Sequence, residues 1–326
     1  MPPTRTRTPS GPRFKRSVFL LVLLGLATCG SARPPSSSPK ASGCVGGGRC
    51  AAPLASARRP DSRSRSSLAG AQPHIALVVM ENHEYGSIIG NSCCPYINSL
   101  VTKGTLFTNY DAVSHPSLPN YLAMTSGGTD GKSGTDSIMA GEINLENLLH
   151  QLSTSGLAWG SYEEQLPSAC YRGSSSGIPP HDYALKHDPA MAYHEVADTN
   201  LCDNVVPYTQ MPSKLPAFSF ITPDECDDMH SCSARTGDDW LKANVPTILS
   251  RLGTNGRLII TFDEGTSGQG GGGHVATLEL GPGVPVGRVS TLLNHYGLLA
   301  GIENMFRLAR LQNAKSATPL PFFFTP

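Results

Sequence analysis

Two apolar runs, each followed directly by acidic or amide residues, constrain the fold of this chain most. Residues 74–80 read His-Ile-Ala-Leu-Val-Val-Met, and residues 258–262 read Leu-Ile-Ile-Thr-Phe. Strands as continuously apolar as these are typical of a parallel sheet that is buried on both faces. Parallel strands need long crossover connections, which are usually helices. The sequence therefore predicts an α/β domain with a mainly parallel central sheet and helices on both faces.

The chain from residue 73 onward fits this architecture. The predicted strands are 74–80, 106–111, 156–162, 216–222, 257–263 and 275–280. The predicted helices are 96–103, 119–126, 144–155, 238–252 and 294–309. Residues 163–215 show little periodicity, and an irregular segment of that length is more typical of a substrate loop or lid than of a plain connector.

The first 72 residues have a different composition. Basic residues in 1–16 precede the apolar stretch 18–27, which is too short to span a bilayer and is typical of a signal peptide. We expect 1–32 to be a signal peptide or a lipoprotein signal, with lipid attachment at Cys29 slightly favoured. The protein is then secreted or extracellular, with a lipid anchor as its one membrane attachment. Residues 33–72 are rich in Ser, Pro, Arg and Gly and predict a disordered tether, which leaves 73–326 as the folded domain.

Charge is divided unevenly between these parts. Residues 1–72 hold 12 of the 25 Lys and Arg but only Asp61 among the 25 Asp and Glu, so 73–326 has 13 basic against 24 acidic residues and a net charge of −11. Nucleic-acid binding depends on clustered Lys and Arg that release counterions. We therefore expect no nucleic-acid partner.

Nine cysteines are typical of an exported protein. Cys226 and Cys232 flank an acidic segment, and Cys170 and Cys202 flank part of the irregular region, so a disulfide within each pair would pin a loop. Thiolate zinc ligands are the alternative, but the adjacent Cys93 and Cys94 are poorly placed to chelate one ion.

Oxygen ligands follow both apolar runs. Glu81 and Asn82 come after the first run, and Asp263 and Glu264 come after the second. Because the carboxyl ends of parallel strands meet at one edge of a sheet, these side chains should converge there. Carboxylate and amide oxygens suit a hard divalent cation. We predict one divalent metal ion of unspecified identity; the alternative is that the acidic residues merely cap loops.

A serine lies on a rigid turn between these segments. Ser117 stands between Pro116 and Pro119, and a helical pattern begins directly after it, so helix N-terminal amides could bind an anion. A serine hydroxyl needs a base or a cation to become nucleophilic. We predict Ser117 as the nucleophile and Ser114 as the second candidate, with a helix cap as the structural alternative for either.

Several further side chains are candidates for the site. His115 lies two residues before Ser117, His187 follows Lys186 in the irregular region, His230 closes the acidic run 227–230, and His274 follows the glycine run 270–273. A single histidine is more often structural than catalytic, and the run 227–230 offers an alternative second metal site. The glycine run lacks the Gly-Lys-Ser/Thr of a phosphate loop. Its flexibility would let His274 move over a substrate, and plain disorder is the alternative. The acidic potential of the domain should raise the pKa of His187 and His230 and give an optimum below neutrality.

These motifs resemble a known family. Met80-Glu-Asn-His-Glu-Tyr85, Ser114-His-Pro-Ser-Leu-Pro-Asn-Tyr-Leu-Ala123, Tyr183-Ala-Leu-Lys-His187, Asp228-Met-His230 with Gly237-Asp-Asp-Trp240, and Thr261-Phe-Asp-Glu264 are similar to the bacterial phosphoesterase family of acid phosphatases and phospholipases C. That family belongs to the alkaline phosphatase-like superfamily. The resemblance covers roughly 74–311 and is strongest with secreted mycobacterial-type acid phosphatases that act on phosphoinositides.

The resemblance implies a role for each motif residue. It makes Glu81, Asn82, Asp263 and Glu264 the ligands of one divalent metal and Ser117 the nucleophile. Beside these we predict His115, His187 and His230 as further catalytic residues, and Asn120, Lys186 and His274 as substrate-binding residues. The superfamily's second zinc site is altered, since Asp263-Glu264 stands where the superfamily has Asp-His. The resemblance thus implies an acid phosphatase that hydrolyses phosphate monoesters, phosphoinositides among them, through a phosphoserine. A phospholipase C acting on phosphodiesters and a non-catalytic surface binding module are the alternatives.

Overall fold

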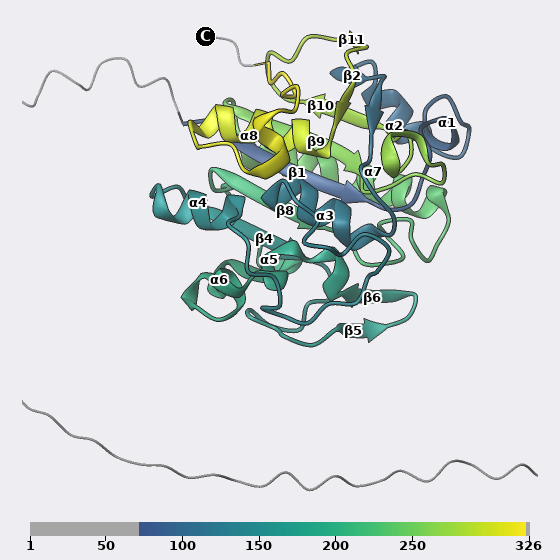
Figure 1. Cartoon of the computed structure of the whole chain (residues 1–326). Coiled ribbons are helices and arrows are strands. Elements are labelled where there is room, and N and C mark those ends of the chain that lie inside the picture. The colour runs from purple at the N-terminus through teal and green to yellow at the C-terminus, as the bar shows by residue number, and fades with distance from the viewer. Residues whose placement is uncertain (1–71, 324–326) are drawn as a thin grey trace, which may run out of the picture. The chain divides into compact units, whose positions relative to one another are not determined.

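The computed structural model describes residues 72–323 (Figure 1), so the expected signal in 1–32 and almost all of the expected tether lie outside the described residues. At the centre is an eight-stranded sheet with the strand order β11-β2-β10-β9-β1-β8-β4-β7. Its strands are β1 (His74–Met80), β2 (Thr105–Phe107), β4 (Trp159–Glu163), β7 (Val205–Pro207), β8 (Phe218–Thr222), β9 (Gly256–Phe262), β10 (Thr277–Leu280) and β11 (Gly287–Val289).

The sheet is mainly parallel. β1 pairs in parallel with β8 on one side and with β9 on the other, so that Val78 lies opposite both Ile221 and Ile260. β10 runs antiparallel to β9 and β2. Ile75 to Met80 are fully buried, as their continuous apolar sequence requires of a central strand covered on both faces. The predicted α/β fold class is confirmed.

Helices cover the sheet. α3 (Ser117–Ser126) packs on α8 (His295–Phe306), and α7 (Ala234–Leu252) packs on β1, β9 and α2 (Pro95–Leu100). Figure 1 shows α3 and α8 in front of the strands and α7 behind them. The shorter helices are α1 (Tyr85–Ile88), α4 (Leu148–Thr154), α5 (Pro189–Ala192) and α6 (His194–Ala197), with single 3-10 turns at Leu185–His187, Asn200–Asn204, Tyr208–Gln210, Gln269–Gly271 and Gln312–Lys315.

Two predicted segments differ from the structure. Residues 106–111 form two short strands instead of one, because β2 ends at Phe107 and β3 (Tyr110–Asp111) pairs with β12 (Leu293–Asn294) outside the main sheet. Residues 163–215 are not one irregular loop. They contain the hairpin of β5 (Ser175–Ile178) and β6 (His181–Ala184) together with short helices, and their last strand, β7, joins the main sheet.

Disulfides pin the loops as the spacing predicts. Cys170 is bonded to Cys202 and Cys226 to Cys232, and Cys93 is bonded to its neighbour Cys94.

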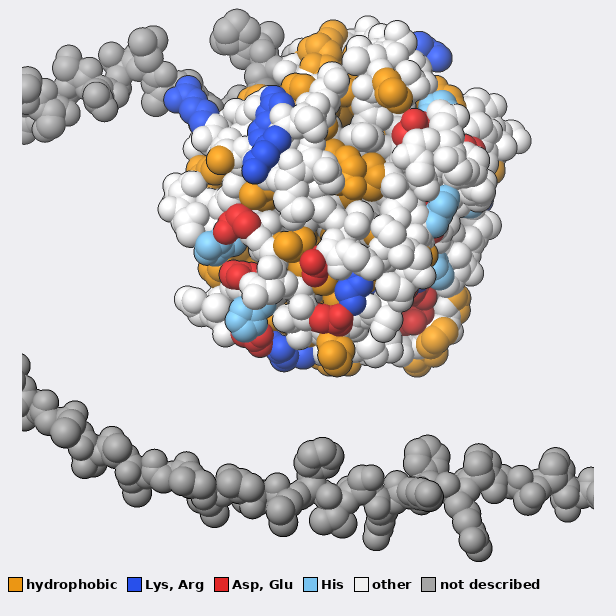
Figure 2. All heavy atoms as spheres, in the orientation of Figure 1, with side chains coloured by type: hydrophobic (Ala, Val, Ile, Leu, Met, Phe, Trp, Pro, Cys, Tyr) orange, Lys and Arg blue, Asp and Glu red, His pale blue; other side chains and the backbone are white. Residues whose placement is uncertain are grey.

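On the face in Figure 2, acidic and basic side chains are interspersed and hydrophobic side chains form small separate groups. Within residues 72–323, none of the helices combines the length and the apolar content needed to cross a bilayer.

Candidate active site

Three neighbouring strands bring three carboxylates together at one edge of the sheet. Asp263 follows β9, Glu81 follows β1, and Asp228 lies in the loop after β8; we call these three the inner acidic group. Backbone hydrogen bonds tie the segments to each other, since the Glu81 amide donates to the Asp228 carbonyl over 2.8 Å and the Asp263 amide donates to the Met80 carbonyl over 2.9 Å. All three carboxylates are completely buried. The parallel order of the strands explains this convergence.

Ser117 faces the inner acidic group from the start of α3. Its hydroxyl donates to Oε2 of Glu81 over 2.9 Å, and Tyr121, one helical turn further on, donates through its own hydroxyl to Oε1 of the same carboxylate. Ser114, the second candidate nucleophile, instead donates to the carbonyl of His115 over 3.3 Å. The structure therefore brings Ser117, and not Ser114, to the carboxylates.

His187 lies between two members of the group. Its Nε2 is 3.4 Å from Oε2 of Glu81, and its Nδ1 is 3.4 Å from Oδ2 of Asp228. The ring is buried and stacks on Tyr121, with centroids 5.3 Å apart. Glu81, His187 and Asp228 thus each offer a ligand atom within 4.8 Å of one another.

Several buried atoms of this site have no hydrogen-bond partner. They are Oδ2 of Asp263, Oδ2 of Asp228 and Nε2 of His187. Leaving such atoms unpaired in a protein interior costs about 1–3 kcal/mol each, more when the group is charged. Unpaired lone pairs on acidic and imidazole groups that face one another are what a divalent cation would bind. The donor set therefore fits a metal ion.

The electrostatics of the site lead to the same conclusion. Burial, and then the charges of Asp263 and Asp228, raise the pKa of Glu81 well above its ordinary value. Burial also raises the pKa of Asp228 well above its ordinary value, and burial followed by the charge of Glu264 raises the pKa of Asp263 to about 7. Without a positive charge, three such carboxylates cannot all ionise near neutral pH. A divalent cation would supply that charge.

Lys186 and His230 form a second layer of the site. Nζ of Lys186 is 3.0 Å from Nε2 of His230 and 3.6–3.7 Å from the carboxylates of Glu225 and Asp136. Burial alone would lower the pKa of Lys186, but the charges of Glu81, Asp136 and Glu225 outweigh it and raise that pKa. Because an ammonium group only donates, Nε2 of His230 must accept, which makes His230 a neutral imidazole here.

The expected rise in histidine pKa is wrong for His187 and His230. Burial lowers the pKa of His187 well below its ordinary value, and the charge of Lys186 lowers it further. Burial followed by the charge of Lys186 lowers the pKa of His230 as well. Desolvation and a cation in contact act more strongly on a buried ring than the diffuse negative charge of the whole domain.

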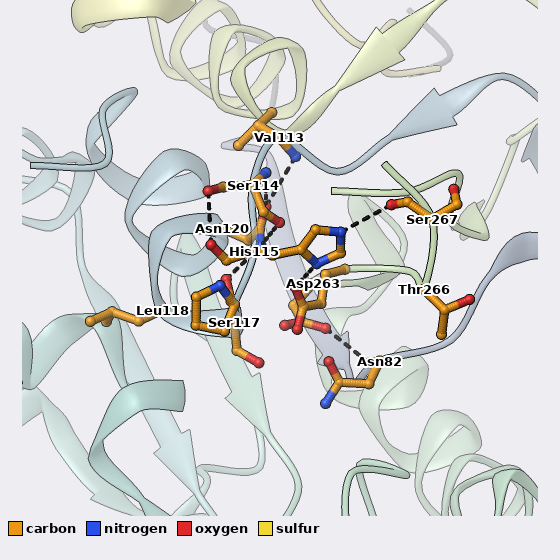
Figure 3. Close-up of polar contacts among 12 residues, drawn as sticks. Asn82, Val113, Ser114, His115, Ser117, Leu118, Asn120, Asp263, Thr266 and Ser267 are labelled. Atoms are coloured by element: carbon orange, nitrogen blue, oxygen red, sulfur yellow. Dashed lines mark hydrogen bonds and ion pairs between the residues drawn. The ribbon is translucent and has the colours of Figure 1, made fainter. Parts of the chain in front are cut away.

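His115 and Glu264 pair with each other beside the inner acidic group. Nδ1 of His115 hydrogen-bonds a carboxylate oxygen of Glu264, and Nε2 lies 3.0 Å from the carbonyl of Ser267. Figure 3 shows the imidazole of His115 between Ser267 and the strand end at Asp263. Glu264 therefore lies at the predicted edge, but its carboxylate is engaged by His115.

The two predicted asparagines have defined partners. Asn82 adopts a left-handed backbone conformation, φ 53°, and its backbone N–H donates to Oδ1 of Asp263 over 3.0 Å (Figure 3). Asn120 accepts from the amides of Val113 and Ser114 and donates to the carbonyls of Ser114 and Pro116. Its side chain holds the turn before the nucleophile, where we had predicted substrate binding.

The start of α3 also differs from the prediction. The amide of Leu118, which we expected to be free for an anion, donates to Oδ1 of Asp136 over 3.0 Å. Asp136 also lies near Lys186, so it joins the start of α3 to the second layer of the site.

His274 does not reach the inner acidic group. Its ring stacks on Tyr85 with centroids 4.4 Å apart, and Nε2 lies 3.1 Å from the carbonyl of Thr108. The glycine run before it packs against the segment that leads to Ser117. A Cβ on Gly271 would lie 2.5 Å from the Val113 carbonyl oxygen, and the backbone there has φ 106°. The glycines permit this close approach, and the packed ring of His274 contradicts its predicted movement over a substrate.

Two residues of the site were missing from the predicted set. Asp228 belongs to the acidic run 227–230, which we had considered only as a separate second metal site, and a third strand end beside the other two was the signal for it. Tyr121 lies four residues after Ser117, the spacing that places two side chains on one helix face.

Comparison with known proteins identifies the family. The sequence pattern of the Phosphoesterase family matches residues 91–309, and the chain belongs to this family. It is 31% identical over 249 residues to a phosphatidylinositol-3-phosphatase of Mycobacterium tuberculosis, an alignment that covers 76% of this chain and 81% of that protein. It is 29% identical over 251 residues to a probable acid phosphatase of Kluyveromyces lactis, covering 72% of this chain and 58% of that longer protein.

The fold has relatives of known structure. A protein in the alkaline phosphatase superfamily from Vibrio parahaemolyticus matches with a TM-score of 0.54 at 12% identity, over 77% of this chain and 71% of that one. At this identity the match shows the fold alone, and the fold is the one that the sequence predicts.

Proposed function

We propose that this protein is a metal-dependent acid phosphatase that hydrolyses phosphate monoesters through a phosphoserine at Ser117. One observation carries the proposal: the Ser117 hydroxyl lies against a buried group of three carboxylates, two of which, Asp228 and Asp263, keep an unpaired oxygen atom. The names of the mycobacterial and yeast relatives support the reaction type, and the name of the yeast relative supports the acid optimum.

The inner acidic group and His187 would hold one divalent cation, with Glu264 beside them in its pair with His115. The cation would act as a Lewis acid and lower the pKa of the Ser117 hydroxyl. Glu81 accepts the hydrogen of Ser117, so the lone pairs of Oγ are left to face an incoming phosphorus atom. A bond then forms between Oγ and phosphorus while the ester bond to the alcohol breaks, and water later cleaves the phosphoserine.

Lys186 is the proposed phosphate ligand. It stays charged, and its Nζ is bound to the neutral His230 on one side of the site. An ammonium group here would neutralise charge on the phosphoryl oxygens as they move through the transition state. His115 would hold Glu264 in place while the ester is bound.

The relatives support a proposed substrate class. The mycobacterial relative is a phosphatidylinositol-3-phosphatase, which makes phosphoinositides the first natural substrates to test. Hydrolysis of phosphodiesters, as in a phospholipase C, is the competing reaction. Release of p-nitrophenol from the mono- and the bis-substituted phosphate separates the two.

We also propose that the protein is exported and carries a lipid at Cys29. The described disulfides support an oxidising compartment, and the basic and apolar composition of residues 1–32 supports a signal. Mass spectrometry of the processed protein from its native host tests both parts. A mature N-terminus at Cys29 with an added lipid mass supports the anchor, and an unmodified N-terminus beyond Cys29 rejects it.

The test of the reaction is Ser117→Ala, with p-nitrophenyl phosphate as substrate. Loss of the nucleophile should lower kcat by about 10³-fold or more while circular dichroism stays unchanged. The wild-type protein, quenched in acid during turnover, should carry one phosphate on the Ser117 peptide. Ser114→Ala is the matched control and should keep kcat within about tenfold. Full activity of Ser117→Ala, or of wild-type protein that elemental analysis shows to be metal-free, would reject the mechanism.

A further inference from the structure

Glu81 is held by two hydroxyl groups from one face of α3. Ser117 donates to Oε2 and Tyr121 donates to Oε1, and the two residues are one helical turn apart. Both oxygens of this carboxylate are therefore bound from the same helix.

The ring of Tyr121 is fixed on both sides. It stacks on His187 at an interplanar angle of 16°, and it packs against Phe220 with centroids 6.1 Å apart. Tyr121 is completely buried, so its hydroxyl cannot replace the hydrogen bond to Glu81 with one to solvent water. The direction of the hydroxyl is thus set by packing and not by the hydrogen bond alone.

We propose that Tyr121 is a positioning residue that fixes the Glu81 carboxylate for metal binding and, through Glu81, places the Ser117 hydroxyl. The inference rests on the metal site of the proposed function. Because both oxygens of Glu81 are bound, the plane of its carboxylate cannot rotate freely. The ring that holds Oε1 also packs on His187, so one side chain orients two of the proposed ligands.

Loss of the hydroxyl has a defined consequence. Without it, Oε1 of Glu81 is a buried oxygen that has no donor, and the carboxylate is free to turn away from Asp228 and Asp263. Residues that orient a metal ligand typically change metal affinity by about 10–100-fold when they are replaced. Tyr121→Phe keeps the ring and its packing on His187, so it removes only the hydrogen bond.

The experiment measures Mn²⁺ binding to purified full-length protein that has been stripped with chelator and dialysed. Electron paramagnetic resonance counts free Mn²⁺ during titration and so gives a Kd without any activity assay. Tyr121→Phe should weaken Mn²⁺ binding by about 10–100-fold. At limiting Mn²⁺ its kcat/KM should fall by a similar factor, and saturating Mn²⁺ should restore most of it.

Tyr193→Phe is the matched control. Tyr193 is also completely buried, and its hydroxyl shares a hydrogen bond of 2.6 Å with Thr125 of the same helix, away from Glu81. Each variant loses one buried tyrosine hydroxyl and its hydrogen bond, but only Tyr121 binds a proposed metal ligand, so Tyr193→Phe should bind Mn²⁺ within about twofold of wild type. The shift in thermal unfolding midpoint on adding Mn²⁺ gives a second measure of binding if either variant is less stable.

Three results are informative. A loss of Mn²⁺ affinity confined to Tyr121→Phe supports the inference. Wild-type affinity in Tyr121→Phe, or an equal loss in Tyr193→Phe, overturns it and leaves the metal site standing. Wild-type protein that binds no Mn²⁺ overturns the metal site of the proposed function, and the inference with it.

Discussion

Two groups of three carboxylates meet at residues 224–228, where the Asp228 amide donates to the Asp224 carbonyl over 2.8 Å, yet they differ in how their oxygens are used. The inner acidic group is Glu81, Asp228 and Asp263. The outer acidic group is Glu164, Asp224 and Asp227, which with His181 and Tyr208 line a cavity of about 320 Å³. Glu81 and Asp228 offer, together with His187, ligand atoms within 4.8 Å of one another, and Glu164, Asp224 and Asp227 do the same.

Hydrogen bonding separates the two groups. Asp224 accepts from the amides of Cys226 and Asp227 and pairs with His181, and Glu164 accepts from the Asp224 amide and from the indole of Trp240. The outer group contributes none of the buried oxygens that lack a partner within residues 72–323, whereas Asp228 and Asp263 contribute one each. Acidic composition alone therefore does not identify a metal site; unpaired oxygens on carboxylates that face one another distinguish the inner group from the outer one.

The largest expected difference between the groups is in turnover. Asp228→Asn should lower kcat/KM for p-nitrophenyl phosphate by at least about 100-fold, the upper end of what is lost when a residue merely orients a ligand. Asp224→Asn should keep kcat/KM within about fivefold, because its carboxylate only holds a loop. Steady-state kinetics of both variants, with metal in excess, is the measurement. Equal losses would mean that both groups serve the reaction.

The next difference is in the stability of the chelated protein, where substitutions in the two groups should change the free energy of unfolding in opposite directions. Asp263→Asn should raise the free energy of unfolding at pH 8 by about 2 kcal/mol, because it removes a buried carboxylate, with a pKa of about 7, whose charge no cation balances in the chelated protein. Asp224→Asn should lower it by about 1 kcal/mol, because its hydrogen bonds lose their charged acceptor. Urea titration measures both. If Asp263→Asn instead lowered the free energy of unfolding in the absence of metal, Asp263 would not be a buried carboxylate that lacks a positively charged partner.

The smallest difference is in the pH dependence of stability. Burial raises the pKa of Glu164 to about 7, so the folded state holds its proton more tightly than the unfolded state. Stability from such a group is present at pH 4 and falls as pH rises to about 7. The inner group acts in the same direction in chelated protein.

Mn²⁺ separates the two contributions. It should flatten the share of the slope that comes from the inner group, and Glu164→Gln should remove about 1 kcal/mol of the remaining change, with or without Mn²⁺. Urea midpoints between pH 4.5 and 8 give the slopes. If Mn²⁺ left the slope of stability against pH unchanged, the inner group would contain no titrating metal ligand.

The sequence was sufficient for the parts of the site that local pattern determines. The apolar runs of β1 and β9 identify buried parallel strands, and Glu81 and Asp263 follow from where those runs end. The proline-flanked Ser117 was found for the same reason, since turn and helix start are encoded within a few residues.

Features that depend on long-range contacts were not predictable in this way. Asp228 joins the site because β8 lies beside β1 in the sheet. The 137 residues between Met80 and Phe218 hide this pairing from the sequence. The pairing of His115 with Glu264 joins residues 149 positions apart. The pKa of His187 depends on its burial, which composition and net charge do not report.

The central claim is that a divalent cation binds the inner acidic group next to Ser117. Anomalous diffraction from crystals soaked in Mn²⁺ tests it directly, because the metal is located without reference to activity. If the cation binds there, one strong anomalous peak lies within coordination distance of Oδ2 of Asp263 and Oδ2 of Asp228, with Ser117 next to it. A peak at Glu164, Asp224 and Asp227 instead, or no peak at either group, would contradict it.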